Sequence, residues 1–307
     1  MTVLHPANLN LDRPWPRAVD EVGGEFIAVP GADPAEVVDE ARRRGVRALA
    51  VADGDPALYA SLTDLEFLSF NCDPRDISAL TGLGALRGLR FGGTWDGRFD
   101  FAALPALEYF AAVELPKTGG FDTLVADHHR LHHASFGRYP FTDLTPLASL
   151  ASLEVLEVLD SRPLASLAGA GALAPSLRQL VLHRCPALTS MAGVETLTQL
   201  EFIDVGACRH VTSLDFVAAL PSLRALRIYD LRDVESLKPL AGHPSLEIVL
   251  FGKTKDLDLD PVFEIPNLRL AHTGRARWNR DVIDLPTIDR LGQDHPAVRA
   301  LNRYGFT

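Results

Sequence analysis

One short apolar pattern returns every 21 to 24 residues along this 307-residue chain, from Leu65 to Leu268. Its cleanest copies read Leu177-x-x-Leu180-x-Leu182, Leu200-x-x-Ile203-x-Val205 and Leu223-x-x-Leu226-x-Ile228. A repeat of this length cannot bury its own apolar edge, so it has to stack on its neighbours. The sequence therefore predicts a solenoid that binds a partner along a long curved face.

Ten copies of the pattern predict ten short parallel strands. Their first leucines are Leu65, Leu86, Leu107, Leu131, Leu153, Leu177, Leu200, Leu223, Leu246 and Leu268. The connections between them are short and rich in glycine and proline, which favours short helical turns over long helices.

The residues before the first copy predict an α/β cap. We expect a short strand at 26–29 and a helix at 34–44, with Asp33 as its N-cap, Pro34 at its first position and Gly45 as its stop. The chain then divides into an N-terminal extension and cap (1–64), ten repeats (65–286) and a C-terminal cap (287–307) with short helices.

The segments 177–185 (LRQLVLHRC) and 200–208 (LEFIDVGAC) resemble the leucine-rich-repeat family, including its cysteine position after the strand. The short period and the return LTSMAGV at 188–194 are similar to the bacterial, internalin-like kind. This resemblance implies an α/β solenoid with a parallel sheet on the concave face and short helical turns on the convex face. It also implies that Cys185 and Cys208 are buried thiols. It does not imply a particular partner, because the family is defined by its scaffold.

Composition and charge exclude several classes of protein. Hydrophobic residues make up 47% of the chain, which is typical of a folded protein, and the formal charge of −10 argues against binding nucleic acid or an anionic membrane. Three cysteines, the absence of a secretory leader and the absence of a long apolar run predict a cytoplasmic protein with reduced thiols. Scarce lysine and abundant arginine and alanine suggest a bacterial source, and we expect a monomer.

The concave face carries the predicted binding site, because residues between the core positions of a strand point to the opposite side of the sheet. Aromatic and arginine side chains there tend to anchor interfaces, and contiguous apolar side chains tend to mark a contact surface. We predict that a protein partner contacts Tyr109, Val155, Glu157, Val181, Phe202, Asp204, Arg227, Tyr229 and Leu250. Asp204 and Arg227 are neighbours in adjacent repeats, so we expect them to pair. The competing explanation is that strands simply favour such residues.

The residue after each first leucine alternates between acidic and basic. In order these residues are Glu66, Arg87, Glu108, His132, Glu154, Arg178, Glu201, Arg224, Glu247 and Arg269. On a parallel sheet they are cross-strand neighbours, so the alternation predicts a ladder of opposite charges with a structural role.

The sequence contains no nucleophile elbow, phosphate-binding loop or dinucleotide fingerprint, so we predict a non-enzymatic protein-binding scaffold without a cofactor. Two alternatives stay open. One is an inhibitor or immunity-type protein that neutralises a toxin or enzyme. The other is a metal-binding protein that uses the cluster His128, His129, His132 and His133. Zinc needs about four converging ligands, and strand alternation directs the last two histidines apart.

Overall fold

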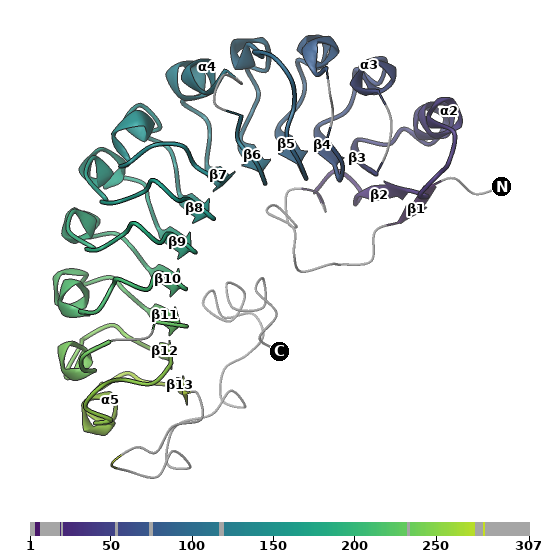
Figure 1. The fold of residues 1–307 in the computed structure, drawn as a ribbon. Helices are drawn as coiled ribbons and strands as arrows, with labels where there is room; N and C mark the ends of the chain where they lie inside the picture. The colour runs from purple at the N-terminus through teal and green to yellow at the C-terminus, as the bar shows by residue number, and fades with distance from the viewer. Residues whose placement is uncertain are drawn as a thin grey trace. The chain divides into compact units, whose positions relative to one another are not determined.

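The computed structural model describes residues 4–6, 19, 21–52, 55–73, 76–116, 120–231, 234–273 and 279. The predicted C-terminal cap at 287–307 lies outside these residues. The chain forms two compact units, Met1–Arg138 (unit 1) and Tyr139–Thr307 (unit 2). Within each unit, every repeat runs from a strand through a short helical turn to the next strand (Figure 1).

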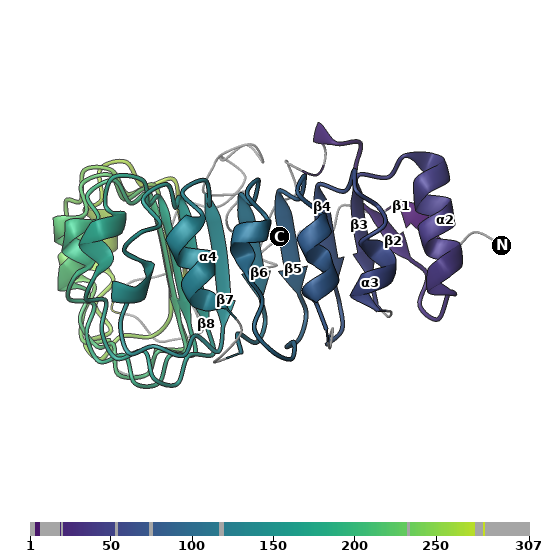
Figure 2. The same cartoon turned by 90° about the horizontal axis from the view of Figure 1, so that it is seen from above.

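Unit 1 begins with an antiparallel strand pair and continues as a parallel sheet. Its elements are β1 (Leu4–Pro6), β2 (Phe26–Ala28), α2 (Pro34–Arg44), β3 (Ala48–Val51), α3 (Pro56–Tyr59), β4 (Phe67–Phe70), η1 (Ser78–Gly82), β5 (Gly88–Phe91), η2 (Phe101–Ala103), β6 (Tyr109–Ala112), α4 (Phe121–Asp127) and β7 (His133–Gly137). Strand β1 pairs antiparallel with β2, and β2 to β7 pair parallel in chain order. The helices cover one side of this sheet (Figure 2).

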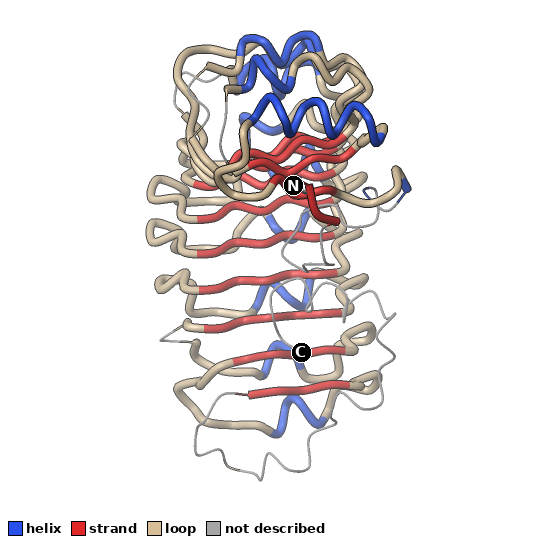
Figure 3. Tube along the Cα trace, turned by 90° about the vertical axis from the view of Figure 1, so that its right-hand side faces the viewer, coloured by secondary structure: helices blue, strands red, loops and turns tan. Residues whose placement is uncertain are grey.

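Unit 2 consists of parallel strands with short helical turns on one side. Its elements are η3 (Thr145–Leu147), β8 (Val155–Leu159), η4 (Ala170–Leu173), β9 (Gln179–His183), η5 (Val194–Thr196), β10 (Phe202–Gly206), η6 (Asp215–Ala219), β11 (Ala225–Tyr229), η7 (Lys238–Leu240), β12 (Ile248–Phe251), α5 (Asp260–Phe263) and β13 (Leu270–Thr273). Strands β8 to β13 pair parallel in chain order. Figure 3 shows the strands of each unit as successive rungs.

The predicted repeat positions are confirmed. Each strand from β4 to β13 begins two residues after its predicted first leucine. Nine of these leucines are fully buried, and Leu268 is half-buried. In unit 1 the core is rich in aromatic residues, and the rings of Phe70, Phe91, Phe110 and Phe136 follow one another at centroid distances of 5.8, 6.3 and 6.1 Å. Each fully buried phenylalanine contributes about 1.5–3 kcal/mol relative to its exposed state.

The predicted helix at the start of the chain is also confirmed. Helix α2 spans Pro34–Arg44, and the Asp33 side chain accepts a hydrogen bond from the backbone N–H of Ala35. Gly45 ends the helix in the left-handed conformation with φ 63°, which a glycine adopts without steric cost. None of the helices in the described ranges is long and apolar enough to cross a bilayer.

The corners that follow β8, β9, β10 and β11 share one geometry. Asp160, Arg184, Ala207 and Asp230 each adopt a φ between 49° and 54° directly after a strand. Inside these corners, the thiols of Cys185 and Cys208 are free and buried, and each sulfur lies within 3.8 Å of two backbone carbonyl oxygens. Ser161 fills the same place one repeat earlier and donates to the carbonyl of Tyr139. The thiol and hydroxyl groups therefore satisfy backbone carbonyl groups that are buried at these corners.

Candidate functional site

The candidate site lies on the strand face, which is the side of each sheet opposite the helices. Eight of the nine predicted residues belong to unit 2, and Tyr109 belongs to unit 1. Strand register aligns the unit 2 residues in rows, and the middle row runs Glu157, Val181, Asp204, Arg227 and Leu250. The predicted site residues of unit 2 are therefore neighbours on β8 to β12.

Three aliphatic side chains lie on this face as predicted, but they are buried and do not form an open apolar patch. Val181 is 1% exposed, Ile248 0% and Leu250 8%. With Phe202, Ala225 and Leu270 they form one cluster, against which Leu159 packs. Strands stand only about 4.8 Å apart, so these side chains pack against one another across neighbouring strands. Val155, on the same face, is half-buried.

Asp204 and Arg227 form the predicted pair. Nη1 of Arg227 donates to Oδ2 of Asp204 at 2.8 Å, and the side chains are 6% and 0% exposed. A buried ion pair of this kind is costly to break, because removing one partner leaves a charge without compensation in a poorly solvated place. The pair therefore fixes the middle of the strand face.

His183 and Tyr229 extend this pair into a network. Nε2 of His183 lies 3.0 Å from Oδ1 of Asp204, although the direction of the contact does not meet hydrogen-bond geometry. Nδ1 of His183 lies 3.2 Å from the hydroxyl of Tyr229. When the phenol donates to Nδ1, a neutral imidazole carries its proton on Nε2, facing the carboxylate. The polar groups of three adjacent strands are thus linked through one carboxylate.

The ring of Tyr229 is held from several sides. The guanidinium carbon of Arg227 lies 4.3 Å from its centroid, and the His183 ring meets it edge-on at 5.3 Å. Burial, together with the nearby Asp204 carboxylate, raises the pKa of the Tyr229 phenol above its usual range. The hydroxyl is therefore protonated at neutral pH. The ring remains half-buried, so it presents a fixed aromatic surface with a polar tip.

In unit 1 the predicted residue Tyr109 lies in a row of rings. Its centroid is 6.0 Å from that of Phe67 and 6.5 Å from that of His133. The Phe67 ring lies across Gly88 on the next strand, because a Cβ at Gly88 would sit 2.4 Å from Cδ1 of Phe67. Tyr109 is half-buried, so part of its ring remains accessible.

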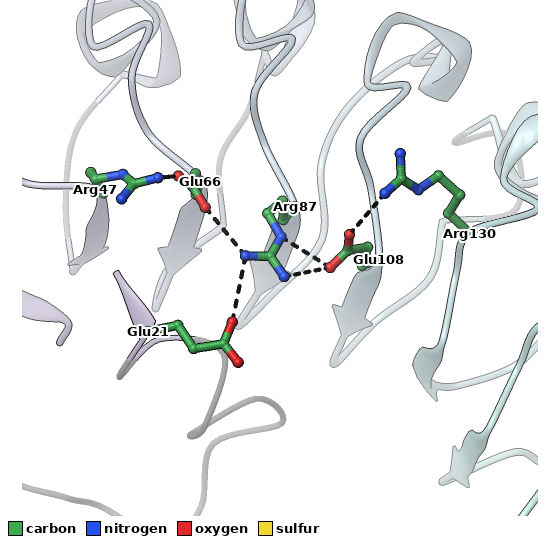
Figure 4. A network of polar contacts seen from close by, with 6 residues as sticks. All are labelled: Glu21, Arg47, Glu66, Arg87, Glu108 and Arg130. Atoms are coloured by element: carbon green, nitrogen blue, oxygen red, sulfur yellow. Dashed lines mark hydrogen bonds and ion pairs between the residues drawn. The ribbon is translucent and has the colours of Figure 1, made fainter. Parts of the chain in front are cut away.

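The predicted charge ladder is present at the N-terminal edge of the strands. In unit 1, Arg87 bonds Glu108 through Nε at 3.0 Å and Nη2 at 2.8 Å, and its Nη1 lies 3.4 Å from Glu66. Glu66 also pairs with Arg47, and Glu108 lies 3.5 Å from Arg130 (Figure 4). Sequence alternation assigned the next basic place to His132 and did not foresee Arg130.

In unit 2 the ladder contacts join Arg224, Glu247 and Arg269, whereas Arg178 bonds Gln199. Glu247 lies 2.9 Å from Nε of Arg224 and 3.6 Å from Nε of Arg269. The backbone N–H of Arg224 donates to the carbonyl of Glu201, and that of Arg269 donates to Glu247. These backbone bonds fix the charged residues as cross-strand neighbours, so the structural role that alternation predicted is supported.

The histidine cluster does not converge on one point. Nε2 of the buried His128 lies 2.8 Å from the carbonyl of Phe101, His129 is exposed, and His133 is buried on the strand face. Among the described residues, no group of three or more potential ligand side chains is placed to hold a metal ion. The geometry therefore gives no support to the metal-binding alternative.

Sequence reasoning missed His183 as a site residue. It shares a row with Gly206 and Tyr229 in the strand register. The sequence signal for this contact was Gly206 between His183 and Tyr229. A glycine on the middle strand leaves space for the two flanking rings to meet above it.

Comparisons with known proteins agree with this architecture. No family model matches the sequence, and no characterised protein matches it in sequence either. Among solved structures, the chain is similar to an internalin (inlF) from Listeria monocytogenes str. 4b F2365. The TM-score is 0.54 at 16% identity, over 74% of this chain and 72% of that chain.

Two further solved structures are similar over a comparable share of this chain. The internalin C2 (inlC2) from the same strain has a TM-score of 0.45 at 20% identity, over 70% of this chain and 84% of that chain. A plant peptide hormone receptor, RGFR1 in complex with RGF2, has a TM-score of 0.45 at 13% identity, over 73% of this chain and 39% of that chain. At such low identities the likeness to inlF shows the fold alone.

Proposed function

We propose that this chain, whose fold is the leucine-rich-repeat solenoid of the internalin kind, is a non-enzymatic scaffold that recognises a protein partner through its strand face. The observation that carries the proposal is the fixed, half-buried ring of Tyr229. Interface anchors are enriched in tyrosine, tryptophan and arginine. A ring that is immobilised before binding loses little conformational freedom when the partner arrives.

The surroundings of Tyr229 support a binding role. Arg227, held by its buried pair with Asp204, contacts the ring, and Nδ1 of His183 lies 3.2 Å from its hydroxyl. Val155, at the edge of the same face, is half-buried and adds apolar contact area. The buried members Val181, Phe202 and Leu250 support this surface from within it, and they are not themselves open to a partner.

The formal charge of −10 favours a partner with a basic surface. We further propose that the protein is a cytoplasmic monomer that binds neither nucleic acid nor membranes and uses no cofactor. An inhibitor or immunity-type role is a special case of the same proposal, and a tight 1:1 complex with an enzyme or toxin distinguishes it.

The test is affinity capture from a lysate of the source organism, with wild-type protein and Tyr229→Ala as parallel baits. The control is Thr198→Ala, an exposed position next to η5. We expect a partner that wild type and Thr198→Ala retain and Tyr229→Ala loses. With the purified partner, Tyr229→Ala weakens binding by about 2 kcal/mol, or about thirtyfold. Equal retention by all three baits would contradict a strand-face site in unit 2.

A further inference from the structure

The strand face of unit 1 is covered in part by a segment of its own chain. Val19 is 3% exposed and forms a buried cluster with Ala48, Phe67 and Ala111. Val22 packs against the same cluster, as does Tyr109. Ala48, Phe67 and Tyr109 share one row across β3, β4 and β6. Two valines from a segment before β2 thus occupy the row that a partner of unit 1 has to contact.

Backbone hydrogen bonds place Val19 and Val22 on one turn of the chain, and both valines contact the same cluster. The backbone N–H groups of Val22 and Gly24 donate to the carbonyl of Val19 at 3.2 and 3.0 Å. Residues three apart on such a turn are neighbours in space, which explains why Val19 and Val22 contact the same cluster. Glu21, between the two valines, is exposed and is not part of that cluster.

Glu21 adds a charge contact at the rim. Its Oε2 lies 3.9 Å from Nη1 of Arg87, which is the central arginine of the unit 1 ladder (Figure 4). The guanidinium of Arg87 also lies 5.6 Å from the centroid of Phe67. The segment therefore contacts two kinds of group on the face. Its valines pack against the cluster that contains the Phe67 ring, and its carboxylate lies near the Arg87 guanidinium.

The connection between this turn and β2 favours a segment that is able to leave the face. Gly23 and Gly24 adopt φ values of 94° and 86°, and a Cβ at either position would meet no atom within 4 Å. Two unpacked glycines form a hinge, because glycine changes its backbone angles without steric cost. Displacement of the turn need not disturb β2 itself.

We propose that the strand face of unit 1 around Phe67 and Tyr109 is a binding surface for a short peptide segment. This segment carries two apolar residues three positions apart and an acidic residue between them. In the free chain, Val19, Glu21 and Val22 occupy this surface as an intramolecular competitor. The inference rests on the proposed function, since it names the kind of partner segment that a strand face accepts. A partner that uses unit 1 has to displace the chain's own turn.

The test uses the full-length chain and a fluorescently labelled peptide with the sequence of residues 17–25 (RAVDEVGGE). The variant Val19→Asp/Val22→Asp cannot seat its own turn, because both valines face an apolar cluster. Fluorescence anisotropy is expected to show saturable binding of the peptide to this variant. Wild type binds at least about tenfold more weakly, since its tethered copy acts at a high effective concentration. A peptide with both valines changed to aspartate binds neither protein.

Two further variants keep the outcome decisive. Glu21→Arg leaves both valines in place and repels Arg87, so it is expected to bind the peptide with intermediate affinity. If the double variant does not fold, Glu21→Arg decides the outcome. The proposal is then overturned when Glu21→Arg binds the peptide no more strongly than wild type does. Failure of the folded double variant to bind the peptide overturns it as well. Adding Tyr229→Ala to the double variant leaves peptide binding unchanged, so this test and that of unit 2 fail independently.

Discussion

The ring of Tyr229 lies directly over Gly206 on the preceding strand. A Cβ at Gly206 would sit 2.2 Å from Cε1 and Cζ of that ring, closer than carbon atoms approach without displacement. Glycine at this position therefore allows the tyrosine to cross β10 and bring its hydroxyl to His183 on β9. In unit 1, the absence of a side chain at Gly88 likewise allows the Phe67 ring to lie over that residue.

Gly206→Ala is accordingly predicted to push the Tyr229 ring off the face. We expect a loss of stability of about 1 kcal/mol, a changed near-ultraviolet circular dichroism signal, and weaker partner binding. Gly252→Ala is the matched control, because it follows β12 and a Cβ there would meet nothing within 4 Å. Similar spectra and urea midpoints for the two variants would contradict the role assigned to Gly206.

Asp204→Ala is predicted to be among the most destabilising substitutions in unit 2. It leaves the buried guanidinium of Arg227 without its carboxylate, which typically costs about 3–5 kcal/mol. Asp160→Ala serves as the control, because Asp160 pairs with Arg184 at the exposed corners and such a pair contributes less than about 1 kcal/mol. Urea denaturation of both variants measures the difference. Equal losses would show that the Asp204 pair is solvated in practice.

Arg87→Ala tests the ladder in unit 1. Arg87 contacts two ladder carboxylates and its side chain is 27% exposed, so we expect a loss of about 1 kcal/mol at low salt. Salt screens partly exposed ion pairs. The difference in unfolding free energy between Arg87→Ala and wild type is therefore expected to shrink as the sodium chloride concentration rises towards about 1 M. Arg98→Ala, at an exposed pair with Asp122, is expected to cause no measurable change. A salt-independent loss at Arg87 would assign its effect to packing.

His243 is predicted to make stability depend on pH. Burial lowers its pKa below the ordinary 6.5, and its Nε2 lies 3.2 Å from the carbonyl of Val217. Since the unfolded chain binds the proton more readily, the contribution of His243 is complete above its unfolded pKa. It is lost as the pH falls through the folded pKa.

The variant His243→Gln does not titrate in this range. The stability of wild type relative to His243→Gln is therefore expected to shrink as the pH falls from about 7.5 to about 5.5. Urea denaturation at several pH values checks this, and parallel stability curves for the two proteins would refute it.

The sequence determined the repeats, the strands and the face to which each residue belongs. The side-chain period of a strand is two and the repeats stack in register, so Leu65 to Leu268 located every repeat strand within the described ranges. The same logic placed Asp204 beside Arg227 and predicted the ladder through Arg87. Both predictions depend only on which residues are cross-strand neighbours. In parallel strands of stacked repeats, these neighbours are residues at the same position of successive repeats.

Only the tertiary structure decided how side chains lean across the sheet and what covers them. Whether Tyr229 reaches His183 depends on the volume left above Gly206, and the burial of Val181 and Ile248 depends on the packing of their whole cluster. The contact of Val19 with Phe67 joins residues that no repeat relates. Periodicity fixes the direction of a side chain, but its contacts are set by the size and shape of everything packed around it.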